Sequence, residues 1–223
     1  MPTINVNRQG SAIGPVSSNF NTARTSNAAS VTDGASGTFT VQYFSSSGRG
    51  AGTKRFKRMF LHFDTSGITD TLSAAHIDID GGGSSPDPND SIMVKSTAFG
   101  GDGGTALATT DFFSSIDYNT PYSSELTTWS TSNNEYTLNS DALADIKNND
   151  NFTLAIVEND SDFANSDQGD GAYDISVNLS VTITLDYTVG STGYGNDING
   201  VSSANISKVI GVATADIDKI IGV

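Results

Sequence analysis

The segment 54–68 constrains the fold of this chain more than any other part of the sequence. Its residues alternate along an extended strand, and both of the resulting faces carry long or aromatic side chains. Aromatic or long apolar side chains on both faces predict a position in the middle of a sheet. The Asp-Thr-Ser-Gly sequence that follows is typical of a turn. One face carries Met59, Leu61 and Phe63, and the other carries Arg58, Phe60 and His62.

Several other segments alternate between apolar and polar residues, with Gly- and Ser-rich loops between them. The clearest alternation runs from Val177 to Tyr187, whereas residues 158–174 form an acidic loop without such a pattern. Roughly eight strands, little helix and long loops predict an all-β fold, specifically a jelly-roll β-sandwich with one short helix. The strands are expected at 38–44, 54–64, 75–80, 91–95, 152–157 and 177–187.

The one helix predicted for the sandwich spans residues 140–147. Asn139 or Ser140 can cap its N-terminus with a side-chain oxygen. Leu143 and Ile146 fall on the same face of such a helix. We therefore expect both of these side chains to point into the sandwich.

Two stretches, KRMFLHFDTSGI at 57–68 and LSAAHIDID at 72–80, resemble the signature of DNRLRE-type domains, the disaggregatase-related jelly rolls. That signature is an arginine with a bulky apolar run, then Phe-Asp-x-Ser, then Ala-x-Leu-x-Leu. Residues 138–156 resemble the helix-then-strand segment of the family, and residues 177–187 resemble its last strand. The likeness extends over residues 20–189. It implies a β-sandwich and leaves the function open.

The end of the chain repeats with a period of eleven residues, because 200–210 is matched by 211–221 and Gly222 begins a third copy. A Gly-rich stretch precedes the repeats. The expected organisation is therefore an N-terminal arm or edge strand at 1–19, the jelly-roll sandwich at 20–189, a linker at 190–197 and a repeat tail at 198–223.

The repeat tail resembles the NGV-x-x-A-x-I-x-K-V repeats of tailed-phage structural proteins. Two units are too few to bury their own apolar residues as a solenoid would, so these residues need a partner. We expect the tail to drive homo-oligomerisation, to a trimer by analogy with phage fibres and decorations, or to dock onto another virion protein. The residues expected to assemble are Val201, Ile206, Val209, Ile210, Val212, Ile217, Ile220 and Ile221.

Composition narrows the class of protein. The chain has 25 acidic and 11 basic residues and a formal net charge of −14, which argues against a nucleic-acid binder. It contains no cysteine, and no apolar run approaches membrane-spanning length. A surface rich in Ser, Thr, Asn and Gly is common outside cells, yet no secretory signal is visible at the N-terminus. A virion protein made in the host cytoplasm and released by lysis fits both facts; a signal removed beforehand is the alternative.

These observations predict a structural protein of a bacteriophage virion, acting in head decoration, the neck, or a fibre or appendage. A carbohydrate-binding module, for instance on a receptor-binding fibre, is the alternative. We do not expect the protein to be an enzyme, because it has no cysteine nucleophile. Its two histidines, His62 and His76, are both expected on outward strand faces. The carboxylates show no spacing that pairs them for glycosidase chemistry. No cofactor is expected beyond a structural Ca²⁺ ion.

Three groups of residues are candidate sites in the sandwich. A basic patch could contact an acidic neighbouring subunit, although a solvated rim is the simpler interpretation. The acidic loop could hold Ca²⁺ through oxygen ligands, or simply be solvated. Aromatic residues could stack on sugar rings, or belong to the core. The patch is Arg49, Lys54, Arg55, Lys57 and Arg58; the Ca²⁺ ligands are Asp160, Asp162, Asp167 and Asp170; the stacking residues are Tyr118, Tyr122 and Trp129.

Overall fold

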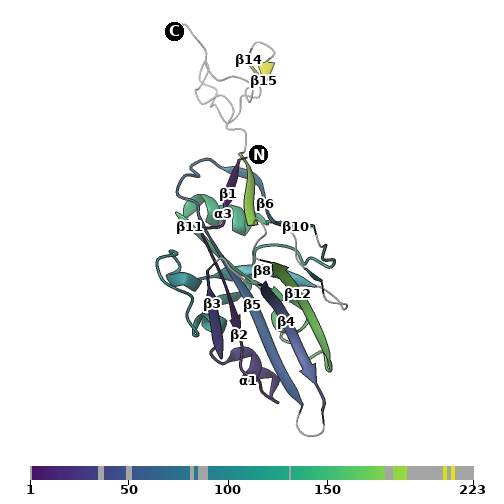
Figure 1. Ribbon diagram of the computed structural model, residues 1–223. Coiled ribbons are helices and arrows are strands. Elements are labelled where there is room, and N and C mark those ends of the chain that lie inside the picture. Colours follow the sequence, from purple (N-terminus) through teal and green to yellow (C-terminus); the bar gives the residue numbers. More distant parts are fainter. Residues whose placement is uncertain are drawn as a thin grey trace.

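In the computed structural model the chain is mostly β, with two antiparallel sheets packed face to face, which confirms the predicted all-β sandwich (Figure 1). Among the residues that the structure describes, no helix has the length and apolar character needed to cross a membrane. The described residues are 2–34, 38–48, 52–80, 83–84, 90–130, 132–178, 183–189, 208–209 and 212–213.

The small sheet has the strand order β1-β13-β6-β10. Its strands are β1 (Thr3–Asn5), β13 (Ile183–Val189), β6 (Leu72–Asp80) and β10 (Asn133–Thr137). The large sheet has the order β7-β12-β4-β5-β11-β8-β9, and two further strands join it beside β5. Its strands are β7 (Gly83–Ser84), β12 (Gly171–Asn178), β4 (Thr38–Ser46), β5 (Thr53–Asp64), β11 (Asn151–Glu158), β8 (Ser91–Ser96), β9 (Ile116–Pro121), β2 (Arg8–Ile13) and β3 (Ser30–Asp33).

β5 is the central strand of the large sheet, as the sequence predicted. β2 lies along one of its edges. Lys54 of β5 pairs with Ser17 on that side and with Ser45 of β4 on the other, so β4 occupies the opposite edge. β11 continues along that second edge, pairing with residues 59–64. β5 is therefore paired on both edges. Its side chains from Arg58 to Phe63 are also buried, on both faces of the strand.

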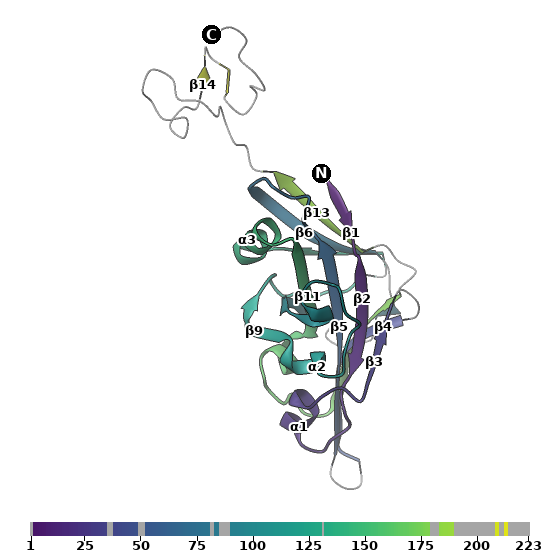
Figure 2. The same cartoon turned by 90° about the vertical axis from the view of Figure 1, so that its left-hand side faces the viewer.

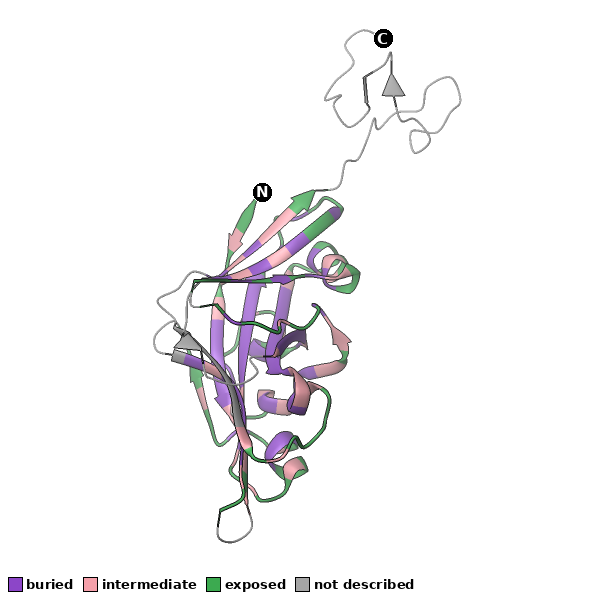
Figure 3. Cartoon of the chain, turned by 90° about the vertical axis from the view of Figure 1, so that its right-hand side faces the viewer, coloured by how far each residue is buried: buried purple, intermediate pink, exposed green. Residues whose placement is uncertain are grey.

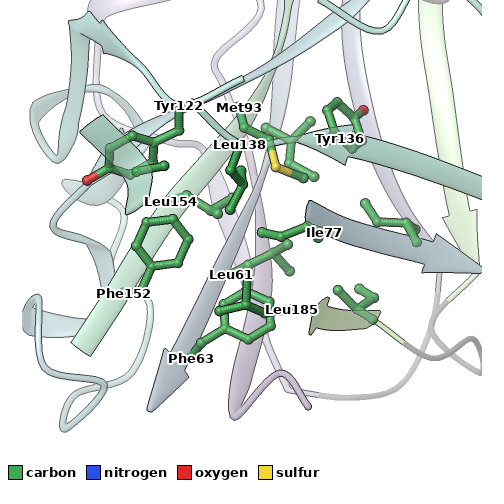
Figure 4. Packing of buried hydrophobic residues seen from close by; sticks show 14 of the residues in the cluster. Leu61, Phe63, Ile77, Met93, Tyr122, Tyr136, Leu138, Phe152, Leu154 and Leu185 are labelled. Carbon is green, nitrogen blue, oxygen red and sulfur yellow. The ribbon is translucent and has the colours of Figure 1, made fainter. Parts of the chain in front are cut away.

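The first core lies between the two sheets. Met59, Leu61 and Phe63 project into it from β5, and none of the three side chains is exposed. Figure 4 shows Leu61 and Phe63 beside Ile77 of β6 and Leu185 of β13, which come from the opposite sheet. Apolar side chains of this kind contribute about 1.5–3 kcal/mol each when they are fully buried, so this core is the main source of sandwich stability.

Helix α3 (Ser140–Asn148) closes one end of this core. The side chain of Asn139 accepts hydrogen bonds from the backbone N–H groups of Asp141 and Ala142, so Asn139 is the N-cap. Ile146 is fully buried, and Leu143 packs against the core. The predicted helix, one of its two predicted caps and its inward face are therefore confirmed.

A second core covers the other face of the large sheet, where the sequence predicted no helices. The short segments that form this layer lie on one side of β5 in Figure 2, and Figure 3 shows the buried strands between the layers. Phe56 and Phe60 of β5 belong to this core, together with Phe112. The covering elements are α1 (Phe20–Thr25), α2 (Asp111–Ser114), the 3₁₀ turn η1 (Ala98–Gly100) and the π turn η2 (Asn159–Phe163).

The N-terminal segment, predicted as an arm or an edge strand, joins both sheets. β1 forms the edge of the small sheet, where Ile4 is opposite Leu185 of β13. β2 then pairs with β5 in the large sheet. The first part of the chain therefore ties the two layers of the sandwich together.

The prediction of a single strand at 177–187 is wrong. The structure has β12 paired with β4 in the large sheet and β13 paired with β6 in the small sheet, so the chain changes sheet within this stretch. Alternation does not register such a change, because strands of both sheets place every second residue toward the same core. β12 also begins at Gly171, inside the stretch predicted as an acidic loop.

Most of the repeat tail lies outside the described residues. Its described part is a short antiparallel pair, β14 (Lys208–Val209) with β15 (Val212–Ala213). Val209 and Val212, two of the predicted assembly residues, are opposite each other in this pair. The other six are outside the described residues: Val201, Ile206, Ile210, Ile217, Ile220 and Ile221.

Candidate functional site

A charged cluster is buried beside the second core. Arg58 projects from β5, and its guanidinium is fully buried. Nε donates to one carboxylate oxygen of Asp162 at 2.6 Å, and an Nη atom donates to the other oxygen at 2.8 Å. The remaining donors of Arg58 reach the backbone carbonyls of Phe112 and of Arg24, the latter at 2.9 Å. Such a bidentate pair, in which every guanidinium nitrogen donates to an oxygen, is the arrangement that makes a buried charge tolerable.

Two more side chains complete this cluster. Arg24 of α1 lies 3.2 Å from a carboxylate oxygen of Asp162, and the hydroxyl of Tyr118 donates to the same carboxylate at 2.8 Å. The guanidinium of Arg24 also stacks over the ring of Tyr118, with 4.3 Å between the guanidinium carbon and the ring centroid. Burial alone would lower the pKa of Arg58, but the carboxylate of Asp162 raises it above its ordinary value. Asp162 therefore links β5, α1 and β9.

Glu158 holds the turn that presents Asp162. Its carboxylate accepts the backbone N–H groups of Asp160, Ser161 and Asp162, at 2.7–3.0 Å, and so caps the π turn η2. Burial raises the pKa of Glu158 to about 7, while the three N–H groups act in the opposite direction. The cluster is therefore an internal support of the fold, with every charged group committed to a partner within the chain.

The predicted basic patch is divided between interior and surface. Arg58 is buried, so the prediction that it contacts a neighbouring subunit is wrong; the second face of β5 is covered by protein rather than water. Lys54 lies 2.9 Å from the carboxylate of Asp167. Arg55 and Lys57 are partly exposed, and Arg49 lies outside the described residues.

The four predicted Ca²⁺ ligands are not among the side chains that the described part of the chain brings close enough together to hold a metal. Asp162 is neutralised by arginines, and Asp167 accepts hydrogen bonds from Tyr43 and Lys54. Asp170 accepts from the hydroxyl of Ser47, whereas Asp160 lies in the π turn. Among the described residues, the one group of His, Asp and Glu side chains close enough to hold a metal is elsewhere, on the small sheet. Three of the four predicted ligands, Asp162, Asp167 and Asp170, instead accept hydrogen bonds from side chains elsewhere in the chain.

The three predicted stacking aromatics do not form a platform. Trp129 and Tyr122 are buried in the first core, with relative exposures of 8% and 1%. Tyr118 packs against the second core under Arg24. Because these rings face different cores, they cannot stack together on a sugar, and the prediction for this trio is wrong.

The two histidines differ from each other. His62, predicted on an outward face, is buried, and its Nδ1 lies 2.8 Å from the hydroxyl of Thr153. The loop at Gly103 lies directly over the ring: a Cβ at this glycine would come within 2.4 Å of Nε2 of His62. Burial lowers the pKa of His62. His76 does lie on an outward strand face, beside Asp78.

A polar cleft of about 460 Å³ opens at the end of the sandwich where β8, β11 and α3 meet. Lys95 donates to Asp145 at 2.6 Å, and the hydroxyl of Tyr122 donates to the same carboxylate. Figure 4 shows this hydroxyl pointing away from the core. Several side-chain amides and hydroxyls line the rest of the cleft: Ser96, Thr97, Asn148, Asn149, Asn151 and Thr153. The sequence signal for this site was only the Asn-rich run after the helix.

Comparison of the sequence with models of protein families and with curated proteins finds no match.

Proposed function

We propose that this chain is a structural component of a tailed-phage virion, in which the β-sandwich forms a rigid body and the repeat tail joins copies of the chain or joins the chain to another virion protein. The observation that carries the proposal is the apolar eleven-residue repeat that follows a sandwich with its own complete cores. The resemblance of the repeats to those of phage structural proteins supplies the virion context.

The strand order supports a jelly roll as the finer description of the sandwich. Eight strands in chain order, β1, β5, β6, β8, β9, β10, β11 and β13, form two rows. The rows are β1-β13-β6-β10 and β5-β11-β8-β9. Numbered one to eight, they read 1-8-3-6 and 2-7-4-5, in which the first strand lies beside the last, as in a chain folded back on itself and wrapped into a sandwich. Jelly rolls are frequent in viral capsids and in lectins.

The described surface of the sandwich supports association through the tail. Among the residues whose side-chain burial the structure describes, which leaves out those of β12 after Gly171 and those of the tail, two large apolar side chains are exposed, Val16 at 61% and Val189 at 39%. An obligate interface needs a larger apolar area than isolated residues provide. Val189 ends β13, where the chain continues toward the repeats. The part of the sandwich surface described in this way offers no apolar patch for assembly, whereas the sequence of the tail is rich in valine and isoleucine.

The energetics of the tail favour a shared core. Each of its larger apolar side chains gains about 1.5–3 kcal/mol on full burial. Ordering the backbone costs about 1–2 kcal/mol per residue, which cancels that gain for one chain alone. Several copies meeting on a common axis bury more apolar surface for each ordered residue, and closed symmetry is the usual result. A trimer is our choice, by analogy with phage fibres and decorations.

Light scattering tests the assembly role. We expect an oligomer for the full chain, and monomers both for the chain ending at Val189 and for the variant Ile206→Asp/Ile217→Asp, which places charge in the shared core. The matched control is Ser202→Asp/Ser207→Asp, which adds the same charge at polar positions of the tail. Oligomers of equal mass for all four proteins would show that the subunit interface lies in the sandwich. Monomers throughout would leave docking onto a different virion protein.

Mass spectrometry of particles purified from the phage that encodes this chain tests the virion role directly. Peptides of the sandwich should be recovered in fixed stoichiometry with the major capsid protein. Immunogold microscopy with antibodies against the folded sandwich should then label one part of the particle. Absence of the chain from intact, density-purified particles would contradict the proposal.

The polar cleft favours carbohydrate binding as a second candidate function. Its lining offers an ammonium group, carboxylates and several amides, which match the hydroxyl groups of a sugar. A glycan array is the direct screen. Asn148→Ala together with Lys95→Ala should abolish any binding found, whereas Asn133→Ala, on the small sheet away from the cleft lining, should leave it unchanged. Glycan binding that survives the double variant would show that the cleft is not the binding site.

A further inference from the structure

The outer face of the small sheet carries a concentration of negative charge. Inward residues of its strands belong to the first core, so the alternating residues point outward. Asp78 of β6 is directly opposite Glu135 of β10 on this face, and His76 of β6 is directly opposite Asp186 of β13. The outward residues of the four strands include no lysine or arginine. Like charges directly opposite each other on neighbouring strands destabilise a sheet. A bound cation would remove this repulsion.

Three of these side chains converge. One ligand atom each from His76, Asp78 and Glu135 lies within 4.8 Å of the others. Nε2 of His76 is 3.4 Å from the carboxylate of Asp78 and 3.8 Å from that of Asp186. Ligands bound tetrahedrally at about 2.0–2.2 Å are roughly 3.4 Å apart, so small side-chain rotations would close the group around one ion. The three residues lie on two paired strands, which fixes their backbones.

Asp78 supplies an independent observation. Its Oδ1 atom is buried and accepts no hydrogen bond of normal length from the described residues, although the side chain as a whole is 25% exposed and also interacts with the side chain of Asn133. A buried carboxylate oxygen without a donor is costly, and in native proteins such an atom often marks a missing water or ion. By contrast, Asp186 accepts hydrogen bonds from the hydroxyls of Thr3 and Thr184 and so is already satisfied.

We propose that His76, Asp78 and Glu135 bind one divalent transition-metal ion of the Zn²⁺ class, which cross-links β6 to β10 on the outer face of the small sheet. The imidazole nitrogen favours Zn²⁺ over Ca²⁺, because Ca²⁺ prefers an all-oxygen shell. Water completes the coordination, so the ion remains accessible from solvent. This inference is independent of the proposed virion role.

Titration of chelator-treated, tag-free protein with Zn²⁺ tests the proposal. We expect one ion per chain by calorimetry and a rise in melting temperature, because an ion that binds the native state stabilises it. His76→Gln and Glu135→Gln should weaken binding by roughly tenfold or more. Asp70→Asn, an exposed carboxylate in the loop before β6, is the matched control and should bind as the wild type does.

NMR spectroscopy and thermal unfolding provide two further tests. The chain has two histidines, and only His76 lies at the surface, so the imidazole NMR signals of His76 should shift with Zn²⁺ while those of His62 stay in place. In chelator, Asp78→Asn should melt higher than the wild type, because it removes the repulsion from Glu135. No uptake of Zn²⁺, uptake that His76→Gln leaves unchanged, or stabilisation by Ca²⁺ but not by Zn²⁺ would each overturn the assignment.

Discussion

The guanidinium of Arg58 is out of contact with water, so its free energy depends on Asp162 and on the two backbone carbonyls that accept its other N–H groups. Removing one member of a buried pair leaves the other charge uncompensated, which costs more than the pair itself contributes. Arg24 remains next to Asp162 but reaches it with a single nitrogen, at 3.2 Å. At the scale of single residues, we therefore expect the stability of the fold to be sensitive to substitution of Arg58.

Arg58→Met should lower the free energy of unfolding by about 3–5 kcal/mol, because it leaves Asp162 buried without its bidentate partner. Urea unfolding monitored by circular dichroism measures the change. Lys147→Met is the control: its exposed side chain donates to the hydroxyl of Thr71, and we expect a change within about 0.5 kcal/mol. The double variant Arg58→Met/Asp162→Leu should recover part of the loss. Equal stabilities of Arg58→Met and the wild type would contradict this account.

Arg58 and His62 also define what the sequence could predict of single residues. Alternation correctly assigned both to the opposite face from Leu61, but it cannot tell whether that face meets water or a second layer. The covering layer comes from segments distant in sequence, such as α1 and η2. The partner of Arg58 is more than a hundred residues away, so no local pattern joins them.

At the scale of elements, the π turn η2 depends on one carboxylate. Glu158 accepts three consecutive backbone N–H groups, and its raised pKa means that the folded protein binds this proton more tightly than the unfolded chain does. Stability from this group is therefore greatest below its ordinary pKa of 4.5 and is lost as the pH rises to about 7.

Glu158→Gln should remove this part of the pH dependence. Between about pH 4.5 and pH 7, we expect the wild type to lose stability relative to the variant, because only the wild type releases the proton. Urea unfolding at several pH values gives the difference. Glu125→Gln replaces an exposed glutamate near the same turn and should run parallel to the wild type. A constant difference between wild type and Glu158→Gln across this range would show that the carboxyl is not coupled to folding.

Elements long enough to show a full hydrophobic period of a strand or a helix were predictable from the sequence, and shorter elements were not. The central strand, β11 and α3 follow from patterns several residues long, with a cap in the case of α3. α2 has four residues and α1 has six, too few to repeat a helical period. The cleft between β8, β11 and α3 and the His76 group were missed because both join strands or helices from separate parts of the sequence.

At the scale of the whole molecule, both described cores use residues between Ile4 and Tyr187. The chain ending at Val189 should therefore fold by itself and melt cooperatively, within a few degrees of the full chain at a concentration where the full chain is monomeric. Circular dichroism and calorimetry measure this. As a control, a chain that begins at Phe20 lacks β1 and β2, and we expect it to be strongly destabilised. An unfolded spectrum for the chain ending at Val189 would place the tail within the core.

The position of β5 also has a consequence during synthesis. Its partners are β2 and β4, made earlier, and β11, which leaves the ribosome about a hundred residues later. Until then, the half of β5 that β11 will pair with presents free backbone groups beside Leu61 and Phe63, a template for pairing between nascent chains. Folding dominated by such distant pairings is slow. Yield of soluble protein should therefore depend on chaperone supply and on slow translation through residues 151–158 more than on the stability of the finished sandwich.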